Sequence, residues 1–459
     1  MLTRIEISGF KTFDAFELDM PPFLAVIGPN ASGKSNFFDA LQFLQRATQS
    51  SLTTAVQQAR GDVGDLFRRR GDGTSVDVIS MAVEVLLAPR VRDPWGTEVE
   101  LTQTRLRYEL TVEKRADDEG NVRLFVTHEE VVPLRRSHDR WRDSTKPSAE
   151  FIETFIKDGR RRQAFLETVG EGRGRAFQTR QDGVQGRARP AEAAEATVLS
   201  SMNSADFRHL YALREEIVNW RFLQLDPIAL RLPGEKYDEE RLTPSGSNLA
   251  RVLHRIQAET TTPEQPKGRL ADISTDLASL IDSVRGIEVR ENEQTRRWEI
   301  VVHGVDDGRY LATVASDGTL RILALLAALY DPKYHGLVCF EEPENGVHPL
   351  RLRTLIRYLR DLTIDPGSAD LDDAEGLTQV IVNSHSPVVL SALDDSQIAV
   401  MDSSTRIEPS PSGRVRSRVT RVRKVSRDAE ATRGLDLHEI TAPQEIHRYE
   451  AAALLEQAP

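Results

Sequence analysis

The spacing of apolar residues predicts strands and helices in separate stretches of the first half of the chain. Residues 1–27 alternate between apolar and polar like two or three short strands, and residues 76–134 alternate again between turns rich in Gly, Asp and Asn. Residues 201–260 carry apolar positions three and four apart, which predicts helices, "SADFRHLYALREEIVNWRFLQL" included. Residues 135–200 are rich in Arg, Gly, Gln and Asp, and we interpret them as an insertion.

Strands and helices alternate in the second half. The apolar helix "DGTLRILALLAALYDP" is followed by the strand "GLVCFEE", the helix "HPLRLRTLIRYLRDL" and the strand "GLTQVIVNSHS", while residues 286–314 and 397–427 predict further strands. Near the start, "LAVIGPNASGKSNFFDALQFL" passes from strand through a Gly-rich loop to a helix. These patterns predict an α/β fold, with one head assembled from both chain ends, a mixed β lobe and an inserted α-helical region.

We expect four segments along the chain. Residues 1–134 form the N-terminal lobe of the head, and residues 286–400 form its C-terminal lobe. Residues 135–285 form the inserted Arg-rich and helical region between them, and residues 401–459 form a C-terminal extension with a basic strand and a helix.

Composition narrows the class of protein. The 39% hydrophobic and 29% charged content of the 459 residues is typical of a soluble globular protein. A formal net charge of -11 argues against a general nucleic-acid coat but allows a local basic patch. The single cysteine, Cys339, excludes an intramolecular disulfide and favours a reducing compartment. Without a secretory signal or an apolar run long enough to span a bilayer, we expect a cytoplasmic protein with no membrane contact.

The segment "GPNASGKS" fits the phosphate-loop pattern G-x-x-x-x-G-K-[ST] between a strand and a helix. Its glycines let backbone amides converge on phosphate oxygens, and the N-terminus of the following helix attracts the same anion. Lys34 can reach the β- and γ-phosphates, and Ser35 can ligate Mg²⁺. We therefore expect ATP and Mg²⁺ as ligands. The candidate nucleotide-binding residues are Gly28, Pro29, Asn30, Ala31, Ser32, Gly33, Lys34, Ser35 and Asn36.

Two adjacent acids end the strand "LVCFEE". We predict that Glu341 binds the magnesium ion, through water, and that Glu342 is the catalytic general base for the attacking water. An exposed acidic turn is the alternative. At the next strand end, in "VIVNSHSP", His385 is a catalytic candidate that could contact the γ-phosphate, whereas a structural histidine is the alternative.

Together these motifs resemble the ATP-binding-cassette (ABC-type) ATPases of the RecF/SMC group, and most of all the branch of the OLD (overcoming lysogenization defect) ATPases and the ATPase subunits of bacterial anti-phage systems. "GPNASGKSN" matches Walker A, "SDGTLRILAL" the signature, "LVCFEEPENGVHP" Walker B with the D-loop, and "VNSHSP" the switch histidine. "PSGSNLARVL" also resembles an element of that branch.

The resemblance implies a head that dimerises around two ATP molecules. Ser316, Asp317 and Gly318 would then lie opposite the partner's phosphate loop, and Asn345 would line the subunit interface near Glu342. For "SDGT" an ordinary helix N-cap is the alternative. Transporter cassettes have "LSGGQ" and an Asp before the catalytic Glu, so "ASDGT" and Glu341 weigh against transport. The glutamine that senses the metal in such ATPases is not identifiable in the sequence.

The function expected from this resemblance is an ATPase switch that dimerises, or forms a higher oligomer, and controls a separate effector such as a nuclease in anti-phage defence. The stretch after "NSHSP" is too short to add a nuclease domain. A RecF-like DNA-repair clamp is one alternative, and a slowly hydrolysing sensor scaffold is another. The clamp would use the basic stretch around 414–427, unless that stretch is a charged edge strand. The Arg-rich insertion could meet nucleic acid or a phage protein.

Overall fold

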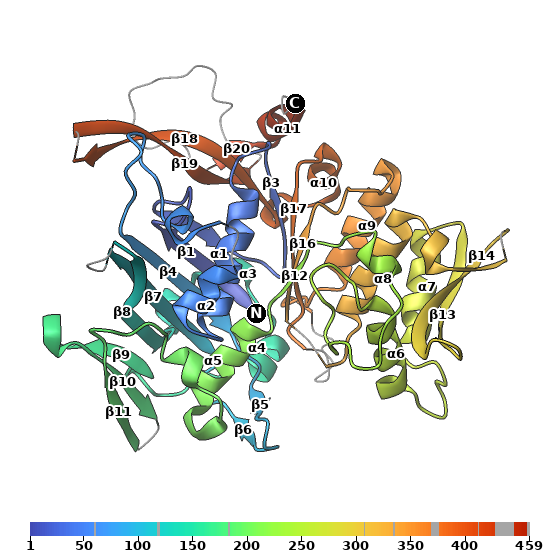
Figure 1. Ribbon diagram of the computed structural model, residues 1–459, viewed down its shortest axis with the longest axis horizontal. Helices are drawn as coiled ribbons and strands as arrows, with labels where there is room; N and C mark the ends of the chain where they lie inside the picture. Colours follow the sequence, from blue (N-terminus) through green and yellow to red (C-terminus); the bar gives the residue numbers. More distant parts are fainter. Residues whose placement is uncertain are drawn as a thin grey trace. The chain divides into compact units, whose positions relative to one another are not determined.

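The chain folds into two compact units (Figure 1). The computed structural model describes residues 1–58, 61–116, 120–181, 184–306, 308–333, 336–368, 376–411, 413–426 and 445–456. Unit 1 comprises Met1–Trp220, Ile364–Gln379 and Asp394–Pro459, and unit 2 comprises Arg221–Thr363 and Val380–Leu393. Helices and strands mix in both, which confirms the predicted α/β class, while the four predicted segment boundaries stay predictions.

An eight-stranded antiparallel sheet organises unit 1. Its strand order is β11-β10-β9-β8-β7-β4-β1-β2. The strands are β1 (Leu2–Ser8), β2 (Phe16–Asp19), β4 (Val78–Leu86), β7 (Arg105–Ala116), β8 (Val122–Pro133), β9 (Leu166–Val169), β10 (Ala176–Gln181) and β11 (Val184–Pro190). Alternate residues of β7, such as Leu106, Tyr108 and Leu110, are buried and form one face of the core. A small hairpin, β5 (Arg90–Arg92) with β6 (Glu98–Glu100), lies outside this sheet.

Strands β9 to β11 come from the stretch that we interpreted as an insertion. They extend the sheet through the antiparallel pairs β8–β9, β9–β10 and β10–β11. The sequence pattern missed them because they are short and rich in Arg, Gly and Gln, whose spacing carries no clear period of two.

The two chain ends meet in unit 1, as predicted. β3 (Phe23–Ile27) pairs in parallel with β18 (Ile398–Ser410), which forms a long hairpin with β19 (Gly413–Ser426) that Figure 1 draws in red. β20 (Glu445–His447) pairs with the end of β19. The Gln379 side chain also donates to the Leu2 carbonyl at 2.7 Å and accepts from the Leu2 amide at 2.8 Å.

Short helices complete unit 1. They are α1 (Lys34–Ala47), α2 (Leu52–Gln57), α3 (Arg140–Thr145), α4 (Ala149–Phe155), α5 (Arg208–Val218) and α11 (Arg448–Glu456), with 3-10 turns η1 (Val63–Leu66), η2 (Arg136–His138), η3 (Gly172–Gly174), η4 (Leu199–Ser201), η5 (Ala205–Phe207) and η8 (Asp395–Gln397). The α1 helix buries Phe37, Leu41 and Leu44 at helical spacing, so the phosphate loop leads into a helix fixed by the core.

Unit 2 combines a short parallel sheet with helices and a hairpin. β16 (Leu337–Glu341) lies between β12 (Arg221–Leu223) and β17 (Gln379–Ser384). The antiparallel strands are β13 (Val284–Asn292), β14 (Arg297–Gly304) and β15 (Arg309–Leu311). The helices are α6 (Leu249–Thr260), α7 (Leu270–Leu280), α8 (Asp317–Leu329), α9 (Pro349–Asp361) and α10 (Pro387–Ala392), with the 3-10 turns η6 (Ala229–Arg231) and η7 (Ala312–Val314). Among the described residues, no helix has the length and apolar character that crossing a membrane requires.

The helix predicted through "NWRFLQL" is wrong at its C-terminal end. The α5 helix ends at Val218, and Arg221–Leu223 form β12 in parallel register with Val338–Phe340 of β16. Three residues are too few for periodicity to distinguish strand from helix, and pairing with a buried neighbouring strand decides between them. This difference matters because β12 ends next to the predicted acids.

A buried carboxylate fixes the loop after the eight-stranded sheet. Glu129 on β8 is fully buried, and its two oxygens accept from the Val198 amide at 2.6 Å and the Leu199 amide at 3.0 Å. The Tyr108 hydroxyl donates to the same carboxylate at 3.2 Å. Burial nevertheless raises the pKa of Glu129 to about 7, because desolvation outweighs these hydrogen bonds.

This pKa predicts a pH-dependent stability. In the unfolded chain the carboxyl returns to a pKa near 4.5, so between about pH 4.5 and 7 the folded state binds the proton more tightly than the unfolded state. The free energy of unfolding should therefore fall by about 3 kcal/mol as the pH rises through this window. Urea unfolding at several pH values measures it. Glu129→Gln should flatten the slope while the exposed Glu150→Gln should not; equal slopes would contradict the assignment.

Candidate functional site

The phosphate loop packs directly against strands from the other end of the chain. β3 is buried throughout, and α1 begins at Lys34 after Gly33, whose φ is 104°. A Cβ atom at Gly33 would lie 2.2 Å from Thr420 Oγ1 on β19, and one at Gly28 would lie 2.1 Å from the Met401 carbonyl oxygen on β18. Both predicted glycines are therefore required by close approach, and Gly33 also by its positive φ.

The groups around this loop suit an anion. Lys34 is largely buried and its Nζ donates to the carbonyls of Gly28 at 2.7 Å and Pro29 at 2.8 Å. The hydroxyl of buried Ser32 has no hydrogen-bond partner among the described residues. A lysine, an unsatisfied hydroxyl and the N-terminus of α1 together fit the triphosphate of ATP. Ser35, the predicted magnesium ligand, is exposed in the first turn of α1.

Two threonines that sequence analysis missed hold the loop in place. Thr420 Oγ1 donates to the Ser32 carbonyl at 3.1 Å and lies 2.7 Å from Thr12 Oγ1. The Thr420 amide donates to the Thr12 carbonyl at 2.8 Å, and Asn36 Nδ2 donates to Thr12 Oγ1 at 3.0 Å. No sequence motif marks Thr12 or Thr420, because their partners lie far away along the chain.

In unit 2, the paired acids lie at the end of β16. Glu341 is its last residue, and Glu342 follows with a φ of 50°, an uncommon value for a residue other than glycine. The Glu342 amide donates to the Asn383 carbonyl at 3.1 Å and to Asn383 Oδ1 at 3.0 Å, and Asn345 Nδ2 donates to Glu342 Oε2 at 2.6 Å. Backbone and carboxylate of Glu342 are thus both fixed, beside the predicted Asn345.

A cavity of about 420 Å³ opens at these acids. Its lining residues are Gln224, Leu225, Asp226, Pro227, Arg321, Glu341, Glu342 and Asn345. Gln224 follows β12 by one residue, and because Leu223 pairs with Phe340, it stands at the level of Glu341. Sequence analysis missed Gln224 because it placed the residue in a helix; the apolar pair Phe222 and Leu223 before it was the available signal.

The element "PSGSN" has a structural explanation. The carbonyls of Pro244 and Ser245 accept from the amides of Gln224 at 2.9 Å and Asp226 at 3.1 Å. The turn therefore supports the segment that carries Gln224 along the cavity wall.

The predicted switch histidine contacts the same acidic turn. His385 Nδ1 lies 3.1 Å from Glu344 Oε1, which also accepts from the His385 amide at 2.9 Å and from Ser384 Oγ at 2.8 Å. With Nδ1 engaged by a carboxylate, Nε2 is the ring nitrogen that can meet another group. The end of β17 is thereby tied to the turn after Glu342.

The signature residues open α8. Ser316 Oγ accepts from the Thr319 amide at 3.2 Å as an N-cap, and Asp317 Oδ1 pairs with Arg231 Nη2 at 2.6 Å. A Cβ atom at Gly318 would lie 2.5 Å from the Gly346 carbonyl oxygen, so this glycine is required by the turn after Asn345. The N-cap alternative is therefore realised, and a role opposite a partner's phosphate loop stays a prediction.

The basic stretch around 414–427 has less unpaired positive charge than its sequence alone suggests. Arg421 and Arg423 both pair with Asp402, at 2.7 and 2.6 Å, and Lys424 pairs with Asp19 at 2.8 Å. Arg414, Arg416 and Arg418 are exposed, and Arg427 lies outside the described residues. Local carboxylates therefore neutralise part of the surface that would meet phosphates.

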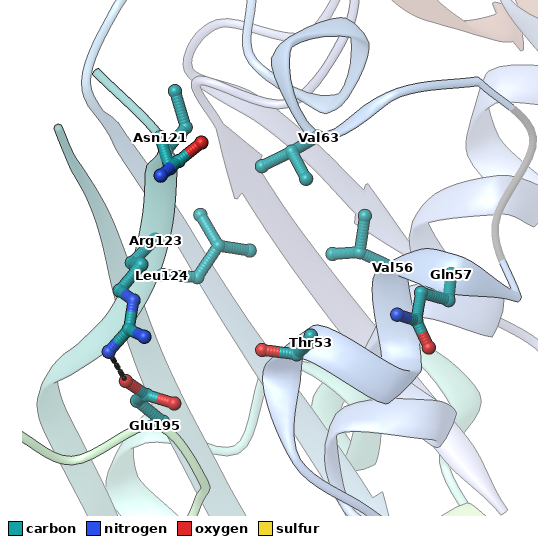
Figure 2. A pocket seen from close by; sticks show the side chains of 9 residues that line it. Thr53, Val56, Gln57, Val63, Asn121, Arg123, Leu124 and Glu195 are labelled. Atoms are coloured by element: carbon teal, nitrogen blue, oxygen red, sulfur yellow. Dashed lines mark hydrogen bonds and ion pairs between the residues drawn. The ribbon is translucent and has the colours of Figure 1, made fainter. Parts of the chain in front are cut away.

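A second cavity, of about 490 Å³, lies in unit 1 and is lined by none of the predicted site residues (Figure 2). Its lining residues are Thr53, Val56, Gln57, Val63, Asn121, Val122, Arg123, Leu124 and Glu195. Figure 2 shows Arg123 and Glu195 joined at its edge, where the ion pair measures 3.1 Å. Apolar Val56 and Leu124 face each other across it, so its chemistry is mixed and includes none of the predicted catalytic residues.

Comparisons with known proteins identify a family that covers most of the chain. The model of a family described as "AAA domain, putative AbiEii toxin, Type IV TA system" matches residues 23–391. The Chromosome partition protein Smc of Methanocaldococcus jannaschii is 46% identical over 50 residues, which is 11% of this chain and only 4% of that relative.

Solved structures of Smc heads are also similar. One is an SmcHead bound to the C-winged helix domain of ScpA, with a TM-score of 0.46 and 13% identity over 91% of this chain and 97% of that one. Another is the Smc head domain with a coiled coil and joint from Pyrococcus yayanosii, with a TM-score of 0.46 and 12% identity over 100% of this chain and 99% of that one.

The threonine contacts predict a role for β19 in nucleotide binding. Thr420→Val keeps the shape of the side chain but removes its hydrogen bonds to Ser32 and Thr12. Losing about 1 kcal/mol of loop stabilisation should raise the Kd for ATP about fivefold. Titration with a fluorescent ATP analogue measures this change. The matched control Thr405→Val, exposed on β18, should bind like the original protein; unchanged binding by Thr420→Val would refute the role.

Proposed function

The chain belongs to the AAA-domain family whose model it matches and is an ATPase, and from this premise we propose that it is an ATP-driven switch in the cytoplasm. ATP binding closes a dimer of two heads, hydrolysis opens it, and the motion controls a separate effector. The observation that carries this proposal is the fixed Glu342 carboxylate in a cavity with Glu341 and Gln224.

The phosphate loop supplies the nucleotide site in this proposal. The backbone amides of residues 28–36, except that of Pro29, which has no N–H, bind the phosphates, and the Lys34 ammonium exchanges its two carbonyl partners for phosphate oxygens. Mg²⁺ would be held by Ser35 and, through water, by Glu341, where it neutralises charge on the phosphates.

Glu342 acts as the general base. Asn345 holds its Oε2, so Oε1 remains to accept the proton of the attacking water. Gln224, at the level of Glu341, is the proposed metal-sensing glutamine that the sequence did not reveal. His385 presents Nε2 to the γ-phosphate while Glu344 holds Nδ1. Ser316, Asp317 and Gly318 complete the partner's site in the closed dimer.

We place the switch in bacterial anti-phage defence, with the effector on a separate chain. The family description names a toxin of a type IV TA system, which supports a protein that works with a second gene product. The RecF-like DNA clamp is the second candidate, favoured by exposed Arg414, Arg416 and Arg418. The ion pairs of Arg421 and Arg423 with Asp402 weigh against it. DNA binding that falls steeply with salt would favour the clamp, and a co-purifying nuclease chain would favour defence.

Glu342→Gln tests the mechanism. The amide keeps the size and the contact with Asn345 but cannot accept the proton, so kcat should fall at least about 100-fold while ATP binding persists. Light scattering should then show a dimer that accumulates with ATP. The exposed Glu293→Gln is the matched control and should hydrolyse normally. Sustained hydrolysis would refute the role of Glu342 as the base. Loss of hydrolysis without a dimer would refute the ATP-closed dimer but would leave the role of Glu342 standing.

A further inference from the structure

Three ligand-type side chains, none of them among the predicted ATPase residues, meet on the half-exposed face of the eight-stranded sheet. Glu109 on β7 lies directly across from Glu130 on β8. His128 precedes Glu130 by two residues, so both side chains point to the same face, while Glu129 between them is buried on the other. A histidine, a neighbour two residues on and a residue of the adjacent strand form a compact triangle on a sheet.

The distances in this triangle are close to those of a metal site. His128 Nε2 lies 3.7 Å from Glu109 Oε2 and 3.9 Å from Glu130 Oε2, and the three atoms lie within 4.8 Å of one another. A tetrahedral zinc ion with bonds of about 2.0 Å places its ligand atoms about 3.3 Å apart. Side-chain rotations would therefore have to bring His128 about half an ångström closer to each carboxylate, and the two carboxylate oxygens up to about 1.5 Å closer to each other.

Neighbouring charges favour a cation at this point. Two carboxylates directly across adjacent strands repel each other, and a cation between them removes that repulsion. Arg107 Nε holds Glu109 Oε1 at 2.6 Å, which orients Oε2 toward His128, as outer contacts orient metal ligands. Glu167 on β9 adds negative charge near Glu130, which favours a cation, whereas Arg175 near His128 adds positive charge that partly offsets it.

We propose that Glu109, His128 and Glu130 form a binding site for a divalent transition-metal ion, with Zn²⁺ as the best fit. One imidazole and two carboxylates are a nitrogen and oxygen set that suits Zn²⁺, and water would fill the fourth position. The imidazole disfavours Mg²⁺, which prefers oxygen ligands. The ion would hold β7 and β8 together. This proposal does not depend on the proposed ATP switch.

Zinc binding to the chelator-treated, nucleotide-free full chain tests this site. Calorimetry should detect one Zn²⁺ equivalent that His128→Ala and Glu130→Gln each weaken at least about tenfold. Zn²⁺ should also raise the Tm of the original protein by mass action, and this rise should be lost in both variants. Glu113→Gln, on the same face of β7, is the matched control and should bind zinc normally. Mg²⁺ at equal concentration should not replace Zn²⁺.

Two results would overturn the site. One is the absence of saturable zinc binding below about millimolar concentration by the original protein. The other is equal zinc affinity in the two ligand variants and the control. If a ligand variant does not fold, the visible spectrum of Co²⁺ bound to the original protein decides, because tetrahedral coordination by imidazole and carboxylates gives an intense absorption. A spectrum of hydrated Co²⁺ alone would refute the proposal.

Discussion

The tight contact between the phosphate loop and β18–β19 is the constraint on which the nucleotide site depends. No side chain fits at Gly28 or Gly33, because the Met401 carbonyl and Thr420 occupy that space. The loop is encoded within the first tenth of the chain, yet its support comes from β18 and β19 in the last seventh. The loop therefore keeps this shape only where β3 and β18 are paired. The contact between the loop and β18–β19 thus links the pairing of distant segments to the ability of the loop to bind phosphate.

The parts of the site that the sequence predicts are those whose chemistry is local. The phosphate loop carries its glycines, lysine and serine in eight consecutive residues, and Glu341, Glu342 and Asn345 lie within one turn. The sequence pattern did not identify Gln224, Thr12 and Thr420. Their roles arise from contacts between segments far apart in the sequence, and no local periodicity encodes such contacts. The α/β class followed from alternation in the long strands, whereas β9 to β11 and β12 are too short to show it. Tertiary pairing decided those segments.

The sequence shows the sign of each charged side chain but not which side chain it pairs with. The basic stretch of β19 left open a phosphate-binding face or a charged edge strand, and Asp402, which binds two of its arginines, lies on the neighbouring strand. Glu344 looked like one more acid in an acidic turn, and it accepts three contacts at the end of β17. Asp402 fixes two side chains of β19, and Glu344 fixes the end of β17. These ion pairs fix the positions of side chains. A count of charged residues therefore overstates how many charges can bind a ligand.

The position of the Lys34 side chain has a consequence for selectivity. Its ammonium is held by two carbonyls of its own loop, so an incoming anion competes with an internal substitute for the phosphate. A small anion such as inorganic phosphate offers few contacts in exchange and is disfavoured. A triphosphate, which also engages the loop amides and the helix N-terminus, can compensate for both lost hydrogen bonds. We therefore expect the loop to bind a triphosphate more tightly than inorganic phosphate, a product of ATP hydrolysis.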